Sequence, residues 1–367
     1  MPTADELLGP EVLRALIASV ERAAPGRELS RLRAAGPLLG PLSLRQRTDL
    51  LKDALLADLP GDYPGLESTV RTALGDEAFS GWLIWPVTEA VTAGALRDGS
   101  GRAFDAALAL LAELSPRLTS EFAVRPLLAA DLGRAIPIVL GWTAHSDERV
   151  RRLASEGTRP FLPWAIRVPA IIAEPASTVP ILDALYRDES EFVRRSVANH
   201  LNDLSRQNPA LVVKTASRWM SAPDANTPRL IRHALRTLIK RGDPGALGLL
   251  GFAPAPAVVV TGPVLGADTV AIGGRLPFEV RLENTGDVRT ALAVDYVVHH
   301  RKANGSQTTK VFKLTTRSLA AGESALLVKV HSFEQITTRA YHPGEHALEV
   351  QVNGVLSGRV AFQLTRS

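Results

Sequence analysis

The sequence predicts a multidomain α + β protein in which an all-α helical-repeat solenoid is followed by an all-β sandwich. Through the first two thirds of the chain, apolar residues recur at three- and four-residue spacing, as in EVLRALIASVERA, which indicates amphipathic helices. The last third alternates apolar and polar residues between Gly, Asn and Asp, which indicates strands. The patterns meet at GFAPAPAVVV (251–260). We therefore expect a helical domain at 1–252 and a β-domain at 257–367.

The helical part repeats itself along the sequence. The clearest copies are, in chain order, ERVRRLASEG (148–157), EFVRRSVANH (191–200) and RLIRHALRTL (229–238). Their anchoring residues Val150, Val193 and Ile231 lie 43 and 38 residues apart, and a weaker copy, EFAVRPLL, begins at Glu121. Each clear copy follows an acidic or polar segment suited to capping a helix. A period near 40 residues with two helices per unit predicts a HEAT-like repeat solenoid.

The C-terminal part has the size and pattern of an immunoglobulin-like sandwich. Residues 257–367 contain about seven short alternating segments, separated by turns at Asn284–Gly286 and Asn304–Gly305. This region contributes 12 Lys or Arg and 9 Asp or Glu to the chain. Because Arg301 and Lys302 lie beside the second turn, we expect this hairpin to add a basic contact for a polyanionic partner that the solenoid covers on one side only.

Composition excludes several classes of protein. The absence of cysteine rules out disulfides, thiolate metal sites and a cysteine nucleophile. No segment has the roughly 18 consecutive apolar residues of a membrane span, so we expect a cytoplasmic location. The sequence has no metal-binding, dinucleotide or phosphate-loop motif, so we expect neither a metal nor a cofactor. The net charge of +4 is compatible with a polyanionic partner.

Arginines recur at matching positions of the repeats. The copies carry Arg151-Arg152, Arg194-Arg195 and Arg232-His233, and the weaker copy carries Arg125. A row of guanidinium groups suits a phosphate backbone. It equally suits ion pairs with acids of the neighbouring repeat, for which Glu148, Asp188 and Glu191 are available. Adjacent helical residues diverge by about 100°, so one Arg of each pair can serve each role.

Three segments depart from generic repeat composition. They are FSGWLIWPVTEAV (79–91), ASEGTRPFLPWAIRVPA (154–170) and VANHLNDLSRQNP (197–209). We expect Trp82 and Trp85 of the first segment to be core residues. Glu156 of the second segment could have a functional role or could simply lie at the end of a helix. His200 of the third could likewise be a functional residue or a hydrogen-bonding spacer.

Together with EFAVRP and PIL-x-x-L-x-x-D-x-SEFVRRSVANHLND, these segments resemble the AlkC family of DNA alkylation-repair glycosylases, relatives of the AlkD helical-repeat enzymes. The resemblance covers roughly residues 40–250, and residues 257–367 fit the subset with a C-terminal immunoglobulin-like domain. It implies excision of cationic N3-alkylated bases, such as N3-methylcytosine and N3-methyladenine, from duplex DNA in base excision repair. It also implies that the N-glycosidic bond is hydrolysed without full base flipping.

The resemblance also implies the site. The expected catalytic residues are Glu121, Trp164 and Asp203, with Glu156 as a reserve carboxylate; which carboxylate faces the deoxyribose is left open. The expected DNA-binding residues are Arg125, Arg152, Arg159, Arg194, Arg195, His200, Asn202, Arg301 and Lys302. The expected enzyme is a bacterial, nucleoid-associated monomer whose partner is double-stranded DNA containing alkylated bases. The alternative function is a non-catalytic HEAT-repeat scaffold that binds DNA or protein.

Overall fold

The computed structural model describes residues 3–59, 61–335 and 340–366. It confirms the predicted order of a helical region followed by a β-region. The chain forms two compact units, one of Met1–Val212 with Trp219–Ala234, the other of Val213–Arg218 with Leu235–Ser367. In the part of the chain that the structure describes, no helix is long and apolar enough to cross a membrane.

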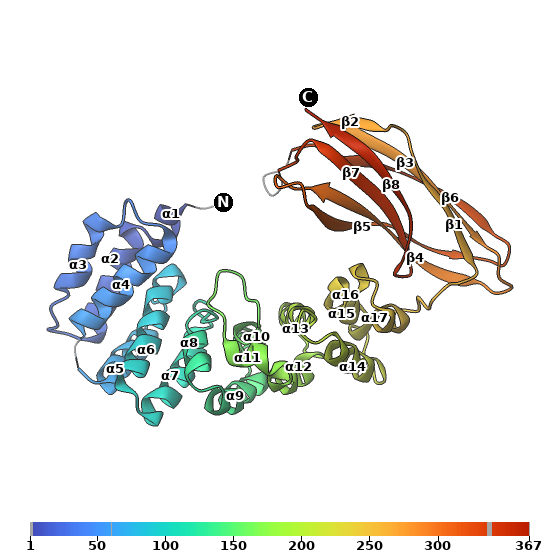
Figure 1. Cartoon of the computed structure of the whole chain (residues 1–367). Coiled ribbons are helices and arrows are strands. Elements are labelled where there is room, and N and C mark those ends of the chain that lie inside the picture. The colour runs from blue at the N-terminus through green and yellow to red at the C-terminus, as the bar shows by residue number, and fades with distance from the viewer. Residues whose placement is uncertain (1–2, 60, 336–339, 367) are drawn as a thin grey trace. The chain divides into compact units, whose positions relative to one another are not determined.

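The helices of the first compact unit are mostly short and stack side by side in chain order (Figure 1). The α-helices are α1 (Ala4–Leu8), α2 (Pro10–Ala23), α3 (Ser30–Ala35), α4 (Leu44–Asp58), α5 (Tyr63–Leu74), α6 (Ile84–Asp98), α7 (Gly101–Leu114), α8 (Val124–Ala130), α9 (Leu132–Gly141), α10 (Glu148–Gly157), α11 (Pro169–Ala173), α12 (Val179–Leu185), α13 (Glu191–Leu204), α14 (Pro209–Met220), α15 (Thr227–Ala234), α16 (Arg236–Lys240) and α17 (Pro244–Leu249). Four 3-10 helices interrupt the series: η1 (Gly36–Leu38), η2 (Gly81–Leu83), η3 (Trp142–Ala144) and η4 (Pro175–Thr178).

The three predicted repeat copies lie on α10, α13 and α15, which pack against one another in that order. Their anchors Val150, Val193 and Ile231 are completely buried, as the shared pattern predicts. The segments before the helices provide caps: Asp147 accepts a hydrogen bond from the N–H of Arg149, and Asp224 accepts one from the N–H of Thr227. The repeat therefore brings equivalent helix faces into one row.

The β-region is a sandwich of two sheets with eight strands among the described residues, one more than the sequence predicts. The strands are β1 (Val258–Leu265), β2 (Thr269–Ala271), β3 (Arg275–Asn284), β4 (Thr290–Arg301), β5 (Gln307–Leu319), β6 (Ser324–Ser332), β7 (Gly344–Val352) and β8 (Val355–Thr365). One sheet has the order β1-β3-β6 and the other β2-β8-β7-β4-β5. The extra strand, β2, has only three residues and pairs in parallel with β8, too short to show an alternating pattern.

The sandwich core is held without cysteine. Along β3 the residues alternate between buried and exposed, and its inward side chains join two apolar clusters, which contain Phe278 and Val280 respectively. The buried amide of Asn284 donates to the carbonyls of Leu319 and Ala320, which fixes the first predicted turn to β5. The hydrogen-bonded Asn284 amide therefore ties two parts of the sandwich together, as a disulfide does in other sandwiches.

Helices α16 and α17 belong to the same compact unit as the sandwich. The turn between them meets the β7–β8 turn at Gly242 and Gly354, where a side chain on either residue would approach the backbone of the other to below 3 Å. Both glycines have positive φ, which other residues rarely adopt. The division into compact units therefore falls before the change in composition near residue 252.

Candidate functional site

Five of the predicted site residues form one chain of ion pairs. Arg152 donates to Glu121 across 2.8 Å and lies 3.6 Å from Glu156. Arg159 donates to Glu156 across 2.7 Å and, through Nε, to Asp203 across 2.9 Å. The order is therefore carboxylate, guanidinium, carboxylate, guanidinium, carboxylate, from the loop before α8 through α10 to the last turn of α13. We call these five residues the carboxylate cluster.

The carboxylate cluster is largely removed from solvent, and it carries one more negative than positive charge. The exposed fractions of the Glu121, Glu156 and Asp203 side chains are 13%, 7% and 5%. Burial by itself lowers the pKa of Arg159, but the adjacent Glu156 and Asp203 outweigh that effect and raise its pKa. The Arg159 guanidinium therefore stays charged between two carboxylates in a low-dielectric setting.

Glu156 is the central member of the cluster, and both of its carboxylate oxygens accept hydrogen bonds. Oε1 accepts from Arg159, and Oε2 accepts from the hydroxyl of Ser196 on α13 across 2.6 Å. The next residue, Gly157, ends α10, where a side chain would approach Val124 of α8 to 2.7 Å. The Glu-Gly pair therefore ends the helix and packs three helices around one carboxylate.

Trp164 lies on a loop that leaves the carboxylate cluster at Arg159. Its side chain is 98% exposed, and its φ of 60° is one of two positive values among the described non-glycine residues. Such a conformation is strained for an aromatic residue and persists only where the surroundings enforce it. Trp164 therefore points to the surface.

Arg125 holds that loop in its conformation from inside the protein. It is completely buried and donates to the carbonyls of Gly157, Arg159 and Ile166 across 2.9, 2.8 and 2.6 Å. Burial, together with the nearby cations Arg167 and Arg159, lowers its pKa to about 10. The prediction that Arg125 binds a phosphate is wrong for this structure, because its guanidinium has no exposed surface and is used to fix the loop.

His200 and Asn202 also lie inside the protein. The His200 ring is completely buried between the hydroxyl of Thr178, 3.1 Å away, and the carbonyl of Ser155, 2.9 Å away. Burial lowers its pKa to about 3, so the ring is neutral. Asn202 is 5% exposed. The prediction that these two residues contact DNA directly is therefore wrong. His200 has the alternative role of a hydrogen-bonding spacer, and Asn202 is buried.

The expectation that Trp82 and Trp85 are core residues is also wrong. Both are partly exposed, and their rings lie 6.0 Å apart. Trp85 stacks on Phe122, the neighbour of Glu121, and its indole N–H donates to Glu89. This contact could not be predicted, because helical spacing alone does not distinguish an inward-facing from a half-exposed helix face. The aromatic pair borders the loop that carries Glu121.

The paired arginines divide into two roles, as their divergence on a helix predicts. Arg151 donates to the carbonyls five and six residues before it, and Arg194 does the same one repeat later. Arg151 also pairs with Asp188. The second arginines differ: Arg152 joins the carboxylate cluster, whereas the side chain of Arg195 is 65% exposed.

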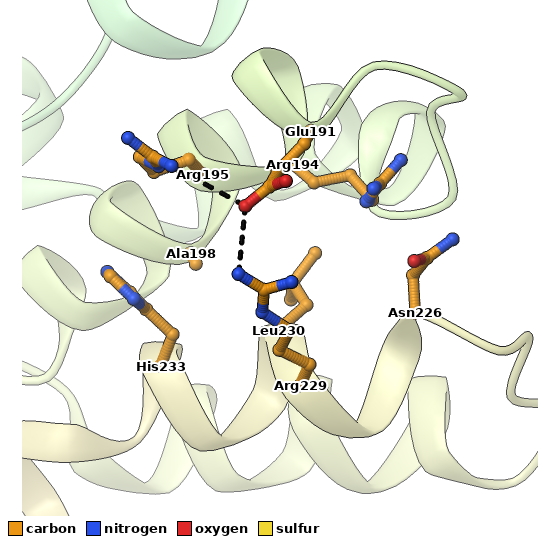
Figure 2. A pocket seen from close by; sticks show the side chains of 8 residues that line it. All are labelled: Glu191, Arg194, Arg195, Ala198, Asn226, Arg229, Leu230 and His233. Carbon is orange, nitrogen blue, oxygen red and sulfur yellow. Dashed lines mark hydrogen bonds and ion pairs between the residues drawn. The ribbon is translucent and has the colours of Figure 1, made fainter.

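Arg194 and Arg195 line a cavity of about 360 Å³ between α13 and α15. Figure 2 shows it with Arg229 and His233 on the α15 side and Glu191 between the two helices. In the second compact unit, Lys302 is exposed at the β4–β5 turn, whereas Arg301 is only partly exposed. In the described ranges, no three His, Asp or Glu side chains are placed to share a metal ion.

Together these features define a helical-repeat protein with a buried carboxylate cluster, an exposed tryptophan and a C-terminal sandwich. A family described as "Uncharacterised protein YhaZ, C-terminal Ig-like domain" matches residues 259–366. The chain is 40% identical over 248 residues to the uncharacterized protein YhaZ of Bacillus subtilis, covering 67% of this chain and 68% of that protein. The structure of Pseudomonas fluorescens alkylpurine DNA glycosylase AlkC, bound to DNA with an abasic site analog, is similar over 99% of both chains, with 32% identity and a TM-score of 0.85.

The chain belongs to the AlkC family, in the subset with an immunoglobulin-like domain. The resemblance inferred from the central motifs is confirmed.

Proposed function

We propose that the protein is a DNA glycosylase that excises cationic N3-alkylated bases from duplex DNA in base excision repair, without full base flipping. The observation that carries the proposal is the carboxylate cluster beside the strained loop of Trp164. Support also comes from the AlkC relative, which is described as an alkylpurine DNA glycosylase bound to DNA with an abasic site analog.

The reaction needs a stabiliser of positive charge more than an acid. An N3-methylated base is already cationic, so the C1′–N bond breaks with its electron pair passing to the base, which leaves neutral. The sugar becomes oxocarbenium-like, water adds to C1′ and one proton is lost. A buried carboxylate stabilises that cation and orients or deprotonates the water. No step requires a metal or another cofactor.

We assign the chemical roles to the two ends of the cluster. Glu156 accepts hydrogen bonds on both oxygens within the protein, so we give it the positioning role. Glu121 and Asp203 are the candidates that face the deoxyribose. Trp164 places the negative face of its ring against the sugar, beside the same developing charge. Arg152 and Arg159 hold these carboxylates in place through their ion pairs.

The DNA backbone is held, in this proposal, by the exposed cations outside the cluster. These are Arg195 on α13, Arg194 beside it, and Lys302 with Arg301 on the β4–β5 hairpin. Each neutralises phosphate charge without reading the sequence, which suits an enzyme that must find lesions in any sequence.

Incubation of the purified protein with duplex DNA containing N3-methyladenine or N3-methylcytosine tests the proposal. We expect release of the free methylated base in the presence of a chelator, which chromatography of the soluble fraction detects. Tight binding of the duplex with no base release would instead support a non-catalytic scaffold.

A further inference from the structure

The cavity between α13 and α15, which we call the α13–α15 pocket, is separate from the carboxylate cluster. Its lining is Glu191, Arg194, Arg195, Ala198, Asn226, Arg229, Leu230 and His233. Three of these residues are arginines and one is an acid. The pocket therefore has a net positive charge around a single carboxylate.

Glu191 bridges the two sides of the α13–α15 pocket. Its Oε1 lies 3.4 Å from Arg195 on its own helix and 3.0 Å from Arg229 on α15, and Figure 2 shows both guanidinium groups directed at it. The three side chains are 51–82% exposed. Exposed ion pairs of this kind stabilise a fold by only about 0–1 kcal/mol each, so fold stability does not explain why one carboxylate collects two arginines.

Two other basic side chains of the pocket are held in place by hydrogen bonds within the protein. Arg194 is held by two backbone carbonyls, and the His233 ring is hydrogen-bonded to Asn199 across 2.9 Å. Little side-chain entropy is therefore left to lose there when a ligand binds. A phosphodiester presents two oxygens to guanidinium donors as a carboxylate does.

We propose that the α13–α15 pocket binds a phosphodiester of the DNA backbone and that Glu191 occupies the position of that phosphate in the free protein. The inference rests on the proposed function and adds two residues to the contact of Arg194 and Arg195 with DNA. These are Arg229, which the sequence did not indicate, and His233, which belongs to the predicted basic row. Binding of DNA displaces the Glu191 carboxylate and transfers Arg195 and Arg229 to the phosphate.

The spacing along α13 fits this assignment. Arg195 and Asp203 lie on one helix, eight residues apart, which corresponds to about 12 Å at a rise of 1.5 Å per residue. One DNA strand presents a phosphate about every 3.4 Å along its axis. Along α13 the pocket therefore lies roughly 12 Å from Asp203, so the pocket and the carboxylate cluster would contact different phosphates of a bound strand.

Glu191→Gln gives the sharpest test, because it removes a charge without removing a donor of the pocket. We expect Glu191→Gln to bind an undamaged duplex about three- to tenfold more tightly than the wild type, since no carboxylate competes with phosphate. Asp105→Asn is the matched control, because Asp105 forms a similarly exposed pair with Arg134 on other helices and its loss changes net charge equally. We expect its DNA affinity to equal that of the wild type.

Arg229→Ala tests the cationic side of the pocket. We expect weaker binding, with the slope of log affinity against log salt concentration reduced by about 0.9. Equal affinities for Glu191→Gln and Asp105→Asn, or an unchanged slope for Arg229→Ala, would overturn the proposal. Saturable binding of inorganic phosphate to Glu191→Gln with unchanged DNA affinity would also overturn it, in favour of a site for a free anion.

These measurements do not depend on catalysis. A wild-type protein that releases no methylated base while Glu191→Gln still tightens duplex binding would disprove the proposed function and leave the pocket assignment standing.

Discussion

Replacement of Arg125 by Met separates loop positioning from direct catalysis. The substitution keeps the aliphatic bulk and removes all three donors to the loop carbonyls. A buried carbonyl left without a donor costs about 1–3 kcal/mol, hence about 3–9 kcal/mol for three. Removal of a buried charge offsets part of this cost: the pKa of Arg125 is lowered to about 10 from 12.5, which corresponds to about 3 kcal/mol. The difference is a net loss of up to about 6 kcal/mol in the free energy of unfolding.

The control for that loss is Arg47→Met. Arg47 is also buried and donates to three carbonyls, those of Leu8, Gly40 and Leu42, in the first helices of the chain. We expect urea unfolding to show comparable destabilisation of both variants. Under conditions where both are folded, only Arg125→Met should lose base excision.

A double-mutant cycle identifies the route of the Arg125 effect. If Arg125 acts by holding the Trp164 loop, Arg125→Met combined with Trp164→Ala excises no more slowly than the slower single variant. If the rate losses of the two single variants multiply in the double variant, this explanation is refuted. Full excision activity in Arg125→Met would also refute it.

Three further predictions follow from the burial and charge of single residues. Trp164→Ala should slow excision at least tenfold yet change the free energy of unfolding by less than about 1 kcal/mol, far below the 3–5 kcal/mol of a buried aromatic; a loss in that larger range would contradict the surface role. The unfolded state takes up a proton at His200 below the ordinary pKa of 6.5, whereas the folded state does so only near 3, so stability should fall by about 2 kcal/mol from pH 7 to pH 5 through this group. His200→Gln should remove that part of the pH dependence, and parallel pH profiles for variant and wild type would disprove it. The double replacement Arg301→Ala with Lys302→Ala should weaken duplex binding and reduce its salt slope by about 1–2, and superimposable salt series would show that the hairpin does not touch DNA.

The fold could be predicted from the sequence because its buried residues recur at regular intervals along the chain. Val150, Val193 and Ile231 recur at the repeat interval, and each fills the same buried position. The sandwich followed from alternation and from turns whose geometry requires Asn and Gly, such as Gly305 with its φ of 82°. The short strand β2 lacked the length for such a pattern.

The carboxylate cluster could be predicted only as a set of residue types. Motifs identified Glu121, Glu156 and Asp203, but their pairing with Arg152 and Arg159 depends on how the repeats stack. The direction of a side chain is the information that a motif does not contain.

The arginines show this limit best. Arg125 is buried and Arg195 exposed, although both were predicted to bind phosphate. An arginine in a helical repeat can point toward the backbone carbonyls of a neighbouring loop or toward solvent. A shift of one position along the helix changes one orientation into the other. Arg229 did not stand out in the sequence, because the pocket that it lines forms only where α13 and α15 meet.

Single-turnover base excision by Asp203→Asn tests the central claim most directly, because Asn keeps the shape of Asp203 and removes its charge. The substrate is a duplex with one N3-methyladenine, with the variant in excess and its affinity for an abasic-site duplex measured in parallel. We expect affinity within about threefold of the wild type and excision slowed at least about a hundredfold. Excision near the wild-type rate at unchanged affinity would contradict catalysis by the Asp203 carboxylate.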